Sequence, residues 1–146
     1  MITFVDGLNQ LQQITIQLLQ ITMLIYEDIT YKIRKAIFNV YNFWGPGLYE
    51  EIYEKSLVVE LESLGLKVES QKSIPVYYMG KKIECDYRLD LLVEDKIILE
   101  LKAVDELKAI HKKQLFTYLK ITDKRLGLLI NFNTTDIMHS IVRIAN

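Results

Sequence analysis

The sequence predicts an α/β domain in which a sheet is flanked by helices. Apolar residues recur at helical spacing up to Gly65, and the spacing then shifts toward the alternation typical of strands. A third helical stretch and a final apolar run follow. With 146 residues, half of them hydrophobic, the chain is long enough for one domain with a substantial core and too short for two.

The first part of the chain, residues 4–25, is rich in leucine, isoleucine and glutamine. Glutamines interrupt it and no cationic stretch precedes it, so neither a signal peptide nor a membrane-spanning helix is expected. An amphipathic helix or a frayed extension fits better. Because Met23 directly precedes the more ordered pattern, residues 1–22 are interpreted as an N-terminal extension, either an appendage or a segment upstream of the true start. Residues 23–146 are then the domain.

Two helices are expected before Gly65. The first covers residues 29–43 and ends against the Gly-Pro-Gly run at 45–47, and the second covers residues 48–63, with Gly65 just past its end as a C-cap. The residues expected to face inward are Ile29, Ile33, Ala36, Ile37, Val40 and Tyr41 on the first helix, and Tyr49, Ile52, Tyr53, Leu57 and Leu61 on the second.

Strands are expected at residues 66–70, 74–78, 83–93 and 96–101, separated by turns at 71–73, 79–82 and 94–95. Asp105 is expected to cap a third helix that runs to about residue 121. The inward residues of that helix are Leu107, Ile110, Leu115, Tyr118 and Leu119. The apolar run 127–132 is typical of a buried strand beside another strand, and residues 136–144 fit either a helix or a strand.

The formal net charge of −1 means that a nucleic-acid partner would have to be held by a local basic patch or through metal ions. The third helix and its exit offer phosphate contacts, although a solvated helix face explains each residue as well: Lys108, Lys112, Lys113, Lys120, Lys124 and Arg125. The single cysteine, Cys85, excludes an intrachain disulfide and fits a reducing cytoplasm. It is expected to be a small buried hydrophobe.

Charged residues interrupt two neighbouring strands of the predicted sheet. In the strand ending at residue 93, one face carries Glu84, Asp86, Arg88 and Asp90. In the next strand, Glu100 and Lys102 interrupt an apolar run of the kind found in buried strands, where unpaired charges are costly. The simpler alternative is a salt bridge between Glu100 and Lys102 on a half-exposed sheet.

The length of the loop between these strands decides whether the charges can meet. A two-residue loop would place Asp90 opposite Leu99, whereas a three-residue loop or a bulge would place it opposite Glu100. We predict the second arrangement, which brings Asp90, Glu100 and Lys102 onto one face.

Such a face would suit metal-assisted phosphodiester chemistry. Two carboxylates held a strand apart are oxygen ligands of the kind that Mg²⁺ prefers, and the ion would polarise a phosphodiester and activate water. Because carboxylates favour the charged form of a neighbouring amine, Lys102 is expected to stabilise the transition state electrostatically rather than act as a base.

Three motifs in this order resemble those of a known group of proteins. Asp90 followed by Glu100-Leu101-Lys102 resembles the D…ExK signature of the PD-(D/E)xK nuclease superfamily, although Leu89 stands where that name has proline. G-x-x-E-x-x-Y at Gly47, Glu50 and Tyr53 resembles the hallmark of the bacterial GxxExxY protein family, a branch of that superfamily. His111, Gln114 and Tyr118 resemble a Q-x-x-x-Y element of several nuclease branches. The likeness spans about residues 25–145.

The resemblance implies a PD-(D/E)xK nuclease-like core, with a mixed central β-sheet flanked by helices. It also implies a hydrolase that binds Mg²⁺ or Mn²⁺ and cleaves phosphodiester bonds in nucleic acid, with DNA favoured over RNA as the substrate. The catalytic set would be Asp90, Glu100, Lys102, Glu50 and Gln114. The metal ligands would be Asp90, Glu100 and Glu50.

Several of these residues also have structural interpretations. Glu50 could simply complement the dipole of its helix, and Tyr53 is expected to be a core aromatic with a bonded hydroxyl. Arg88, which could instead pair with Asp86 or Glu100, is a candidate substrate contact together with His111 and Tyr118.

Two other functions remain open. One is a non-catalytic nucleic-acid-binding or regulatory module on the nuclease-like fold. The other is an interaction protein whose N-terminal segment packs against a partner or a second copy, as in a homodimer; no membrane partner is expected. The nuclease interpretation requires the face shared by Asp90, Glu100 and Lys102 to be concave and covered by the helices that carry Glu50 and Gln114.

Overall fold

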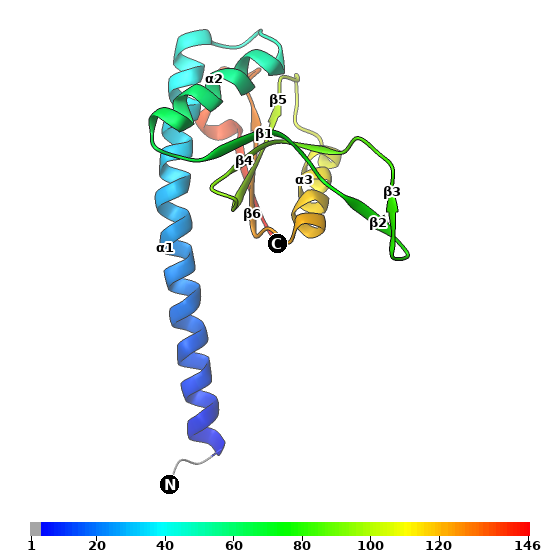
Figure 1. The fold of residues 1–146 in the computed structure, drawn as a ribbon. Coiled ribbons are helices and arrows are strands. Elements are labelled where there is room, and N and C mark those ends of the chain that lie inside the picture. The colour runs from blue at the N-terminus through cyan, green and yellow to red at the C-terminus, as the bar shows by residue number, and fades with distance from the viewer. Residues whose placement is uncertain (1–3) are drawn as a thin grey trace. The chain divides into compact units, whose positions relative to one another are not determined.

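The computed structural model describes residues 4–146, apart from the side chains of residues 22, 23 and 25, so residues 1–3 of the predicted extension lie outside it. The elements, shown in Figure 1, are α1 Phe4–Trp44, α2 Glu50–Ser63, β1 Val68–Ser73, β2 Val76–Tyr78, β3 Lys81–Ile83, β4 Arg88–Val93, β5 Ile97–Lys102, α3 Ala109–Thr122, β6 Leu126–Asn131, a 3-10 turn Met138–Ser140 and β7 Ile141–Ala145. Contacts divide the chain into two compact units, Met1–Arg34 and Lys35–Asn146.

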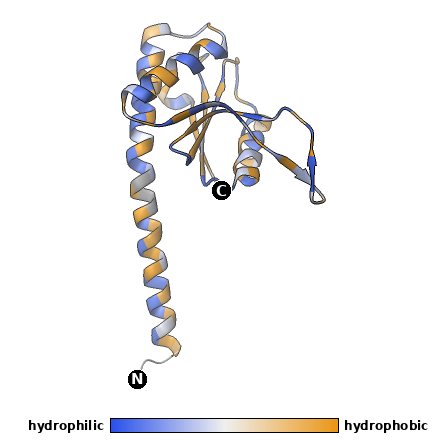
Figure 2. Ribbon diagram, viewed as in Figure 1, coloured by the Kyte–Doolittle hydropathy of each residue, from blue (hydrophilic) through white to orange (hydrophobic). Residues whose placement is uncertain are grey.

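The first helix begins much earlier than its predicted start at Ile29. It is continuous over 41 residues, because the leucines and glutamines before Ile29 favour helix and no proline interrupts them. Large apolar side chains between Phe4 and Leu24 are exposed, and Figure 2 shows hydrophobic and hydrophilic residues interleaved along this stretch. A search of the described helices found none whose length and hydropathy would suit a membrane span.

The second unit contains a five-stranded sheet in the order β1-β4-β5-β6-β7. β5 and β6 are parallel, whereas the other three neighbouring pairs are antiparallel. The sheet is therefore mixed, and the predicted fold class is confirmed. β6 is buried throughout, and β5 is buried except at Lys102.

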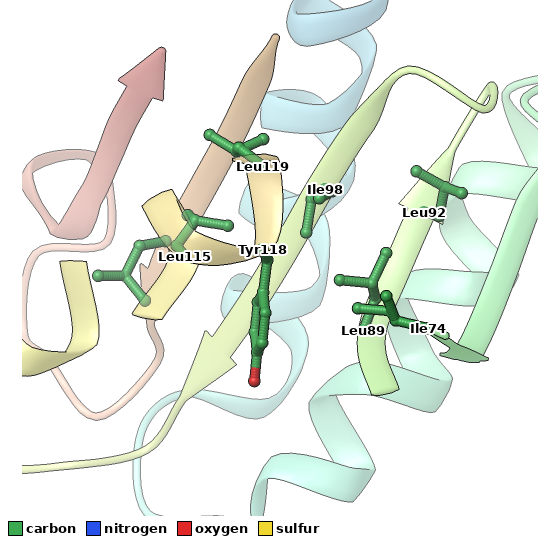
Figure 3. Packing of buried hydrophobic residues seen from close by; sticks show 8 residues of the cluster. Ile74, Leu89, Leu92, Ile98, Leu115, Tyr118 and Leu119 are labelled. Carbon is green, nitrogen blue, oxygen red and sulfur yellow. The ribbon is translucent and has the colours of Figure 1, made fainter. Parts of the chain in front are cut away.

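Both faces of the sheet are covered. On one face, α3 packs through Leu115, Tyr118 and Leu119 onto a cluster that Figure 3 shows from close by. The other members of this cluster are Ile74, Leu89, Leu92, Ile98 and Leu129. The approach of α3 to the sheet needs a glycine, because a Cβ on Gly127 would lie 2.8 Å from Leu115 Cδ1.

The other face of the sheet is also buried from solvent. Leu91, Leu99 and Leu128 alternate with the residues that face α3, and all three are fully buried. α2 contacts β1 and β5 and buries three residues of its own, Tyr53, Leu57 and Leu61. A charged side chain in the middle of β5 therefore has little access to water.

Two helix starts were predicted too early. α2 begins at Glu50 rather than residue 48, and Tyr49, which was expected to face inward, is exposed. α3 begins at Ala109, because the N–H of Lys108 donates to His111 Nδ1 at 3.0 Å and so caps the helix there. The predicted cap Asp105 lies in the preceding loop, and Ile110 is exposed rather than inward.

The predicted strand 83–93 is two strands, β3 and β4, joined by an irregular segment. Pairing of β1 with β4 ends at Ser73 and Arg88, so residues 84–87 have no partner strand in the described sheet. Glu84 and Asp86 therefore do not share a strand face with Asp90, as the alternation had suggested. Cys85, predicted to be buried, is exposed for the same reason.

Other strand bounds differ by smaller amounts. β1 continues to Ser73 through the predicted turn at 71–73, and β2 begins at Val76 after a proline. The predicted turn at 79–82 is shorter, since Lys81 already belongs to β3. The apolar run near the C-terminus forms a buried strand beside β5, as predicted. The ambiguous segment 136–144 resolves into the 3-10 turn followed by β7.

Candidate active site

The turn between β4 and β5 has the length that the site requires. Val93 pairs with Ile97, so three residues separate the paired strands. Glu94 and Asp95 have φ of 54° and 53°, and the Lys96 N–H donates to the Val93 carbonyl at 3.0 Å. The turn is thus a tight two-residue reversal followed by Lys96 as one extra residue. The predicted loop geometry is confirmed.

At the end of β4 and β5 that lies away from this turn, hydrogen bonds to side chains replace the backbone hydrogen bonds between the two strands. Pairing ends at Leu91 and Leu99, and the next position places Asp90 opposite Glu100. The Asp90 N–H donates to Glu100 Oε1 at 3.2 Å, and the Leu101 N–H donates to Asp90 Oδ2 at 2.8 Å. Backbone donors therefore hold both carboxylates at the point where the two strands stop pairing.

The Glu100 carboxyl is buried beside a second acid. Only 4% of the residue is exposed, and burial raises its pKa to about 9, with the Asp90 charge as the next cause. The N–H of Asp90 and the positive charge of Lys102 act in the opposite direction. The pair therefore resists carrying two negative charges in the absence of a counter-charge.

Asp90 has a raised pKa for similar reasons. Burial is the largest cause, the hydrogen bond from Leu101 lowers the pKa, and the charges of Glu54 and Glu50 raise it. Two glutamates of α2 therefore lie close enough to Asp90 to influence its ionisation.

The simpler alternative for Glu100 and Lys102 does not hold. None of the ion pairs among the described residues joins them, and Glu100 lies in a fully covered strand rather than on a half-exposed sheet. Lys102 is half-buried at the end of β5, in register with Asn131 of β6. Its charge acts on Glu100 through space without a direct contact.

A cleft of about 610 Å³ opens beside Asp90 at the N-terminus of α2. Its lining residues are Leu48, Tyr49, Glu50, Glu51, Glu54, Lys55, Ser70, Gln71, Asp90 and Ala103. Glu50 Oε1 accepts a hydrogen bond from the Ala103 N–H at 3.3 Å, just beyond β5. The structure thus brings Glu50 and Asp90 to one concave surface. Glu100, held against Asp90, and Lys102 do not line it.

Tyr53 holds the turn that positions Glu50. Its hydroxyl donates to the Gly45 carbonyl at 2.7 Å and accepts from the Leu48 N–H at 3.1 Å, and its ring stacks on Phe132. The side chain is fully buried, so the predicted role as a core aromatic with a bonded hydroxyl is confirmed. The turn itself needs glycine, since Gly45 and Gly47 have φ of 67° and 101°.

Replacing Tyr53 with phenylalanine is expected to lower the free energy of unfolding by about 1–3 kcal/mol, because it leaves the partly buried N–H of Leu48 and carbonyl of Gly45 without their partner. Urea denaturation of both proteins measures the difference. Tyr49→Phe is the matched control, since Tyr49 is exposed and should lose almost nothing. Equal losses in the two variants would contradict the clamping role.

Two polar residues near the site are not among those predicted from the sequence. Glu54 accepts hydrogen bonds from Ser70 Oγ at 2.7 Å and from Gln71 Nε2 at 2.9 and 3.0 Å, which joins α2 to β1 beside Asp90. Its position four residues after Glu50, on the same helix face, is a signal that could have found it.

The second missed residue is Asn131, buried at the end of β6. Its Oδ1 accepts from the Val104 N–H at 3.1 Å, and its Nδ2 donates to the Val104 carbonyl at 2.8 Å. It thereby fixes the chain just beyond Lys102. The sequence feature that could have identified Asn131 is the position of a polar residue at the end of an apolar strand.

Gln114 and Tyr118 lie on α3, and neither is among the residues that line the cleft. Gln114 Nε2 donates to the Tyr118 hydroxyl at 2.9 Å. Tyr118 is buried, and Figure 3 shows its hydroxyl pointing out of the apolar cluster. Burial, and then the charge of Glu100, raises the pKa of this phenol. Gln114 is therefore bonded to a phenol that lies within electrostatic range of Glu100.

His111 and Arg88 are also outside the Asp90 cleft. His111 caps α3 and lines a second cleft of about 520 Å³ formed with the loop that follows β5. Arg88 is exposed, and its Nε donates to Asp86 Oδ1 at 2.6 Å, which is one of the two partners expected for it.

The carboxylates near Asp90 offer oxygen ligands of the kind that a divalent metal needs. Among the described residues, no group of three or more His, Cys, Asp or Glu side chains is arranged to hold an ion, so Glu50, Asp90 and Glu100 do not form a ready three-carboxylate cluster. Mg²⁺ usually takes only one or two protein carboxylates, and Asp90 with Glu100 supplies that number. A dication would also favour the ionised form of two acids whose pKa values are raised. The pair fits Mg²⁺ or Mn²⁺.

Comparison with known proteins gives one family. The model of the PD-(D/E)XK nuclease superfamily matches residues 27–144, which include every candidate site residue from Glu50 to Tyr118. Neither a curated protein nor a solved structure gave a significant match. The five-stranded mixed sheet with its flanking helices is consistent with the core of that superfamily. By this match over most of its length, the chain belongs to the PD-(D/E)XK nuclease superfamily.

Proposed function

We propose that this chain is a metal-dependent nuclease of the GxxExxY branch. It hydrolyses phosphodiester bonds in nucleic acid, with DNA favoured over RNA as the substrate. The observation that carries the proposal is the Asp90–Glu100 pair. Backbone donors hold these two carboxylates where β4 and β5 stop pairing, and one of them opens on a cleft. The branch is supported by the Gly47, Glu50 and Tyr53 motif, whose tyrosine clamps the turn before Glu50.

In this proposal, Asp90 and Glu100 hold Mg²⁺ or Mn²⁺. Such an ion, when bound, supplies polarisation of the phosphodiester and a more acidic water. Glu50 completes the site as a further ligand or by holding water, a role supported by its place in the same cleft and by its influence on the Asp90 pKa. Its bond to the Ala103 N–H keeps its carboxylate at the end of β5.

Lys102 stabilises the negative charge that develops on the phosphoryl oxygens. Its half-buried position at the end of β5, where solvent screening is reduced, supports this role. Gln114 acts as a positioning residue, since its bond to Tyr118 orders a phenol that lies within electrostatic range of Glu100.

The test is cleavage of a panel of single- and double-stranded DNA and RNA, with Mg²⁺, with Mn²⁺ and with EDTA. The wild-type protein should cleave at least one substrate only when a divalent ion is present, and Asp90→Ala should abolish that activity. Glu84→Ala is the matched control, because Glu84 is an exposed acid that precedes β4. Equal activity of the wild type and Asp90→Ala would refute the assigned site. Binding without cleavage by the wild type would favour the non-catalytic module instead.

A further inference from the structure

A short hairpin stands apart from the main sheet. Among the described residues, β2 and β3 pair only with each other, and Met79 and Gly80 form the two-residue turn between them, with φ of 49° and 76°. Figure 1 shows this hairpin extending away from the main sheet. Neither strand therefore contributes to the ladder that builds the core.

The hairpin presents aromatic and basic side chains to solvent. Tyr77 and Tyr78 are 64% and 68% exposed, and Lys81 and Lys82 are exposed as well. The register pairs Tyr77 with Lys82 and Tyr78 with Lys81, so each face of the ribbon carries one ring and one ammonium group. Neither lysine belongs to an ion pair among the described residues. Residues 76–83 contain no acid.

The hairpin leaves the sheet near the candidate active site. The last pair between β1 and β4 joins Ser73 to Arg88, and the hairpin is inserted between these two residues. Arg88 is only two residues from Asp90 on β4. At about 3.3 Å per residue, the five residues that follow Ser73, up to Tyr78, let the hairpin reach at most about 17 Å from that edge.

The cleft itself cannot anchor a polyanion by charge. Four carboxylates line it, those of Glu50, Glu51, Glu54 and Asp90, and Lys55 is the single cation among its described lining residues. Lys55 is already paired with Glu51 at 2.6 Å. Apart from the proposed metal ion, a nucleic-acid backbone that reaches Asp90 therefore needs cations from a neighbouring element.

We propose that the β2–β3 hairpin is a substrate-holding arm that binds unpaired nucleotides beside the Asp90 cleft. Lys81 and Lys82 contact phosphates, and the rings of Tyr77 and Tyr78 stack on bases. Exposed aromatic rings beside cations are the combination that binds single strands, because every base offers a face for stacking whatever its sequence. This inference rests on the proposed nuclease function and adds the class of substrate, single-stranded or locally unpaired nucleic acid.

The test measures binding to a fluorescent single-stranded DNA oligonucleotide by anisotropy, with EDTA present so that no cleavage occurs. The proteins are the full-length wild type, Tyr77→Ala with Tyr78→Ala, Tyr77→Phe with Tyr78→Phe, and Lys81→Ala with Lys82→Ala. The matched control for charge is Lys35→Ala with Lys96→Ala, which removes two other exposed lysines that have no ion pair among the described residues. Thermal unfolding verifies that each variant is folded.

The alanine variant of the tyrosines should bind roughly 10-fold more weakly or worse, whereas the phenylalanine variant should bind like the wild type, because stacking needs the ring and not the hydroxyl. Loss of Lys81 and Lys82 should also lower the slope of log affinity against log salt by roughly 1–2. The control pair should change affinity far less. For the wild type, a matching duplex should bind more weakly than the single strand, and the alanine variant of the tyrosines should lose most of this preference.

The outcomes separate the arm from the proposed function. Wild-type binding that is indifferent to all hairpin variants would overturn the arm alone. Absence of both binding and cleavage by the wild type would overturn the arm and the nuclease proposal together. Hairpin variants that change the oligomeric state without changing DNA affinity would assign the hairpin to a protein contact and would also overturn the arm.

Discussion

Replacing Lys102 with alanine is expected to reduce metal-dependent cleavage by roughly 10²–10³-fold while leaving the fold and the affinity for divalent ions nearly unchanged. Within the described residues, no hydrogen bond or ion pair of the Lys102 amine holds another element in place, so its loss removes charge rather than structure. The charge lies at the half-buried end of β5, where solvent would screen its attraction to a developing negative charge on phosphate less than at an exposed position.

Single-turnover cleavage at saturating metal measures this effect, and Mn²⁺ binding followed by its paramagnetic signal measures the ion site independently. Lys96→Ala is the control, because it removes the same charge from the turn between β4 and β5, at the other end of β5 from Lys102. Asp90→Asn should differ from Lys102→Ala by losing Mn²⁺ affinity as well as activity. A Lys102→Ala protein with full activity would remove the lysine from the catalytic set.

Replacing Glu100 with glutamine is expected to flatten the dependence of stability on pH. The ordinary pKa of a glutamate is 4.5, and that of Glu100 in the folded protein is about 9, so between these values the folded state holds a proton that the unfolded state releases. The free energy of unfolding of the wild type therefore falls as pH rises from about 4.5 to about 9. The change over that window should be roughly 2–5 kcal/mol, and glutamine removes most of it.

Urea denaturation at pH 5, 7 and 9 without divalent ions measures this difference. The glutamine keeps an oxygen that can accept from the Asp90 N–H, so the variant should match the wild type near pH 5 and exceed its stability near pH 9. Glu84→Gln, at an exposed acid, should show the slope of the wild type. The same slope in Glu100→Gln and the wild type would mean that Glu100 does not retain its proton in the fold.

The position of Asp90 opposite Glu100 could be predicted because it depends on local features alone. Side chains alternate along each strand, and the length of one turn sets the register. The same is true of the turn before α2 and the buried run of β6, where glycine and apolar residues act over short distances. These parts of the fold and the site were visible in the sequence.

Features that depend on distant residues could not be predicted in this way. β4 starts at Arg88 because β1, far earlier in the chain, stops pairing there. The loop before α3 is held by Asn131, which lies 27 residues beyond Val104, so Asp105 does not start the helix. The exposure of Cys85 follows from the absence of a described partner strand beside it. Alternation along one segment contains no information on such pairings.

The extra residue in the turn between β4 and β5 also determines which kinds of mutation this protein can tolerate. Lys96 is exposed, so many amino acids should be accepted there. Loss of its codon is a different event, because a shorter turn would move every side chain of β5 to the opposite face of the sheet. Glu100 would still be encoded but would no longer lie opposite Asp90 on the same face. In a lineage that keeps this site, the number of residues in the turn should vary less than their identity.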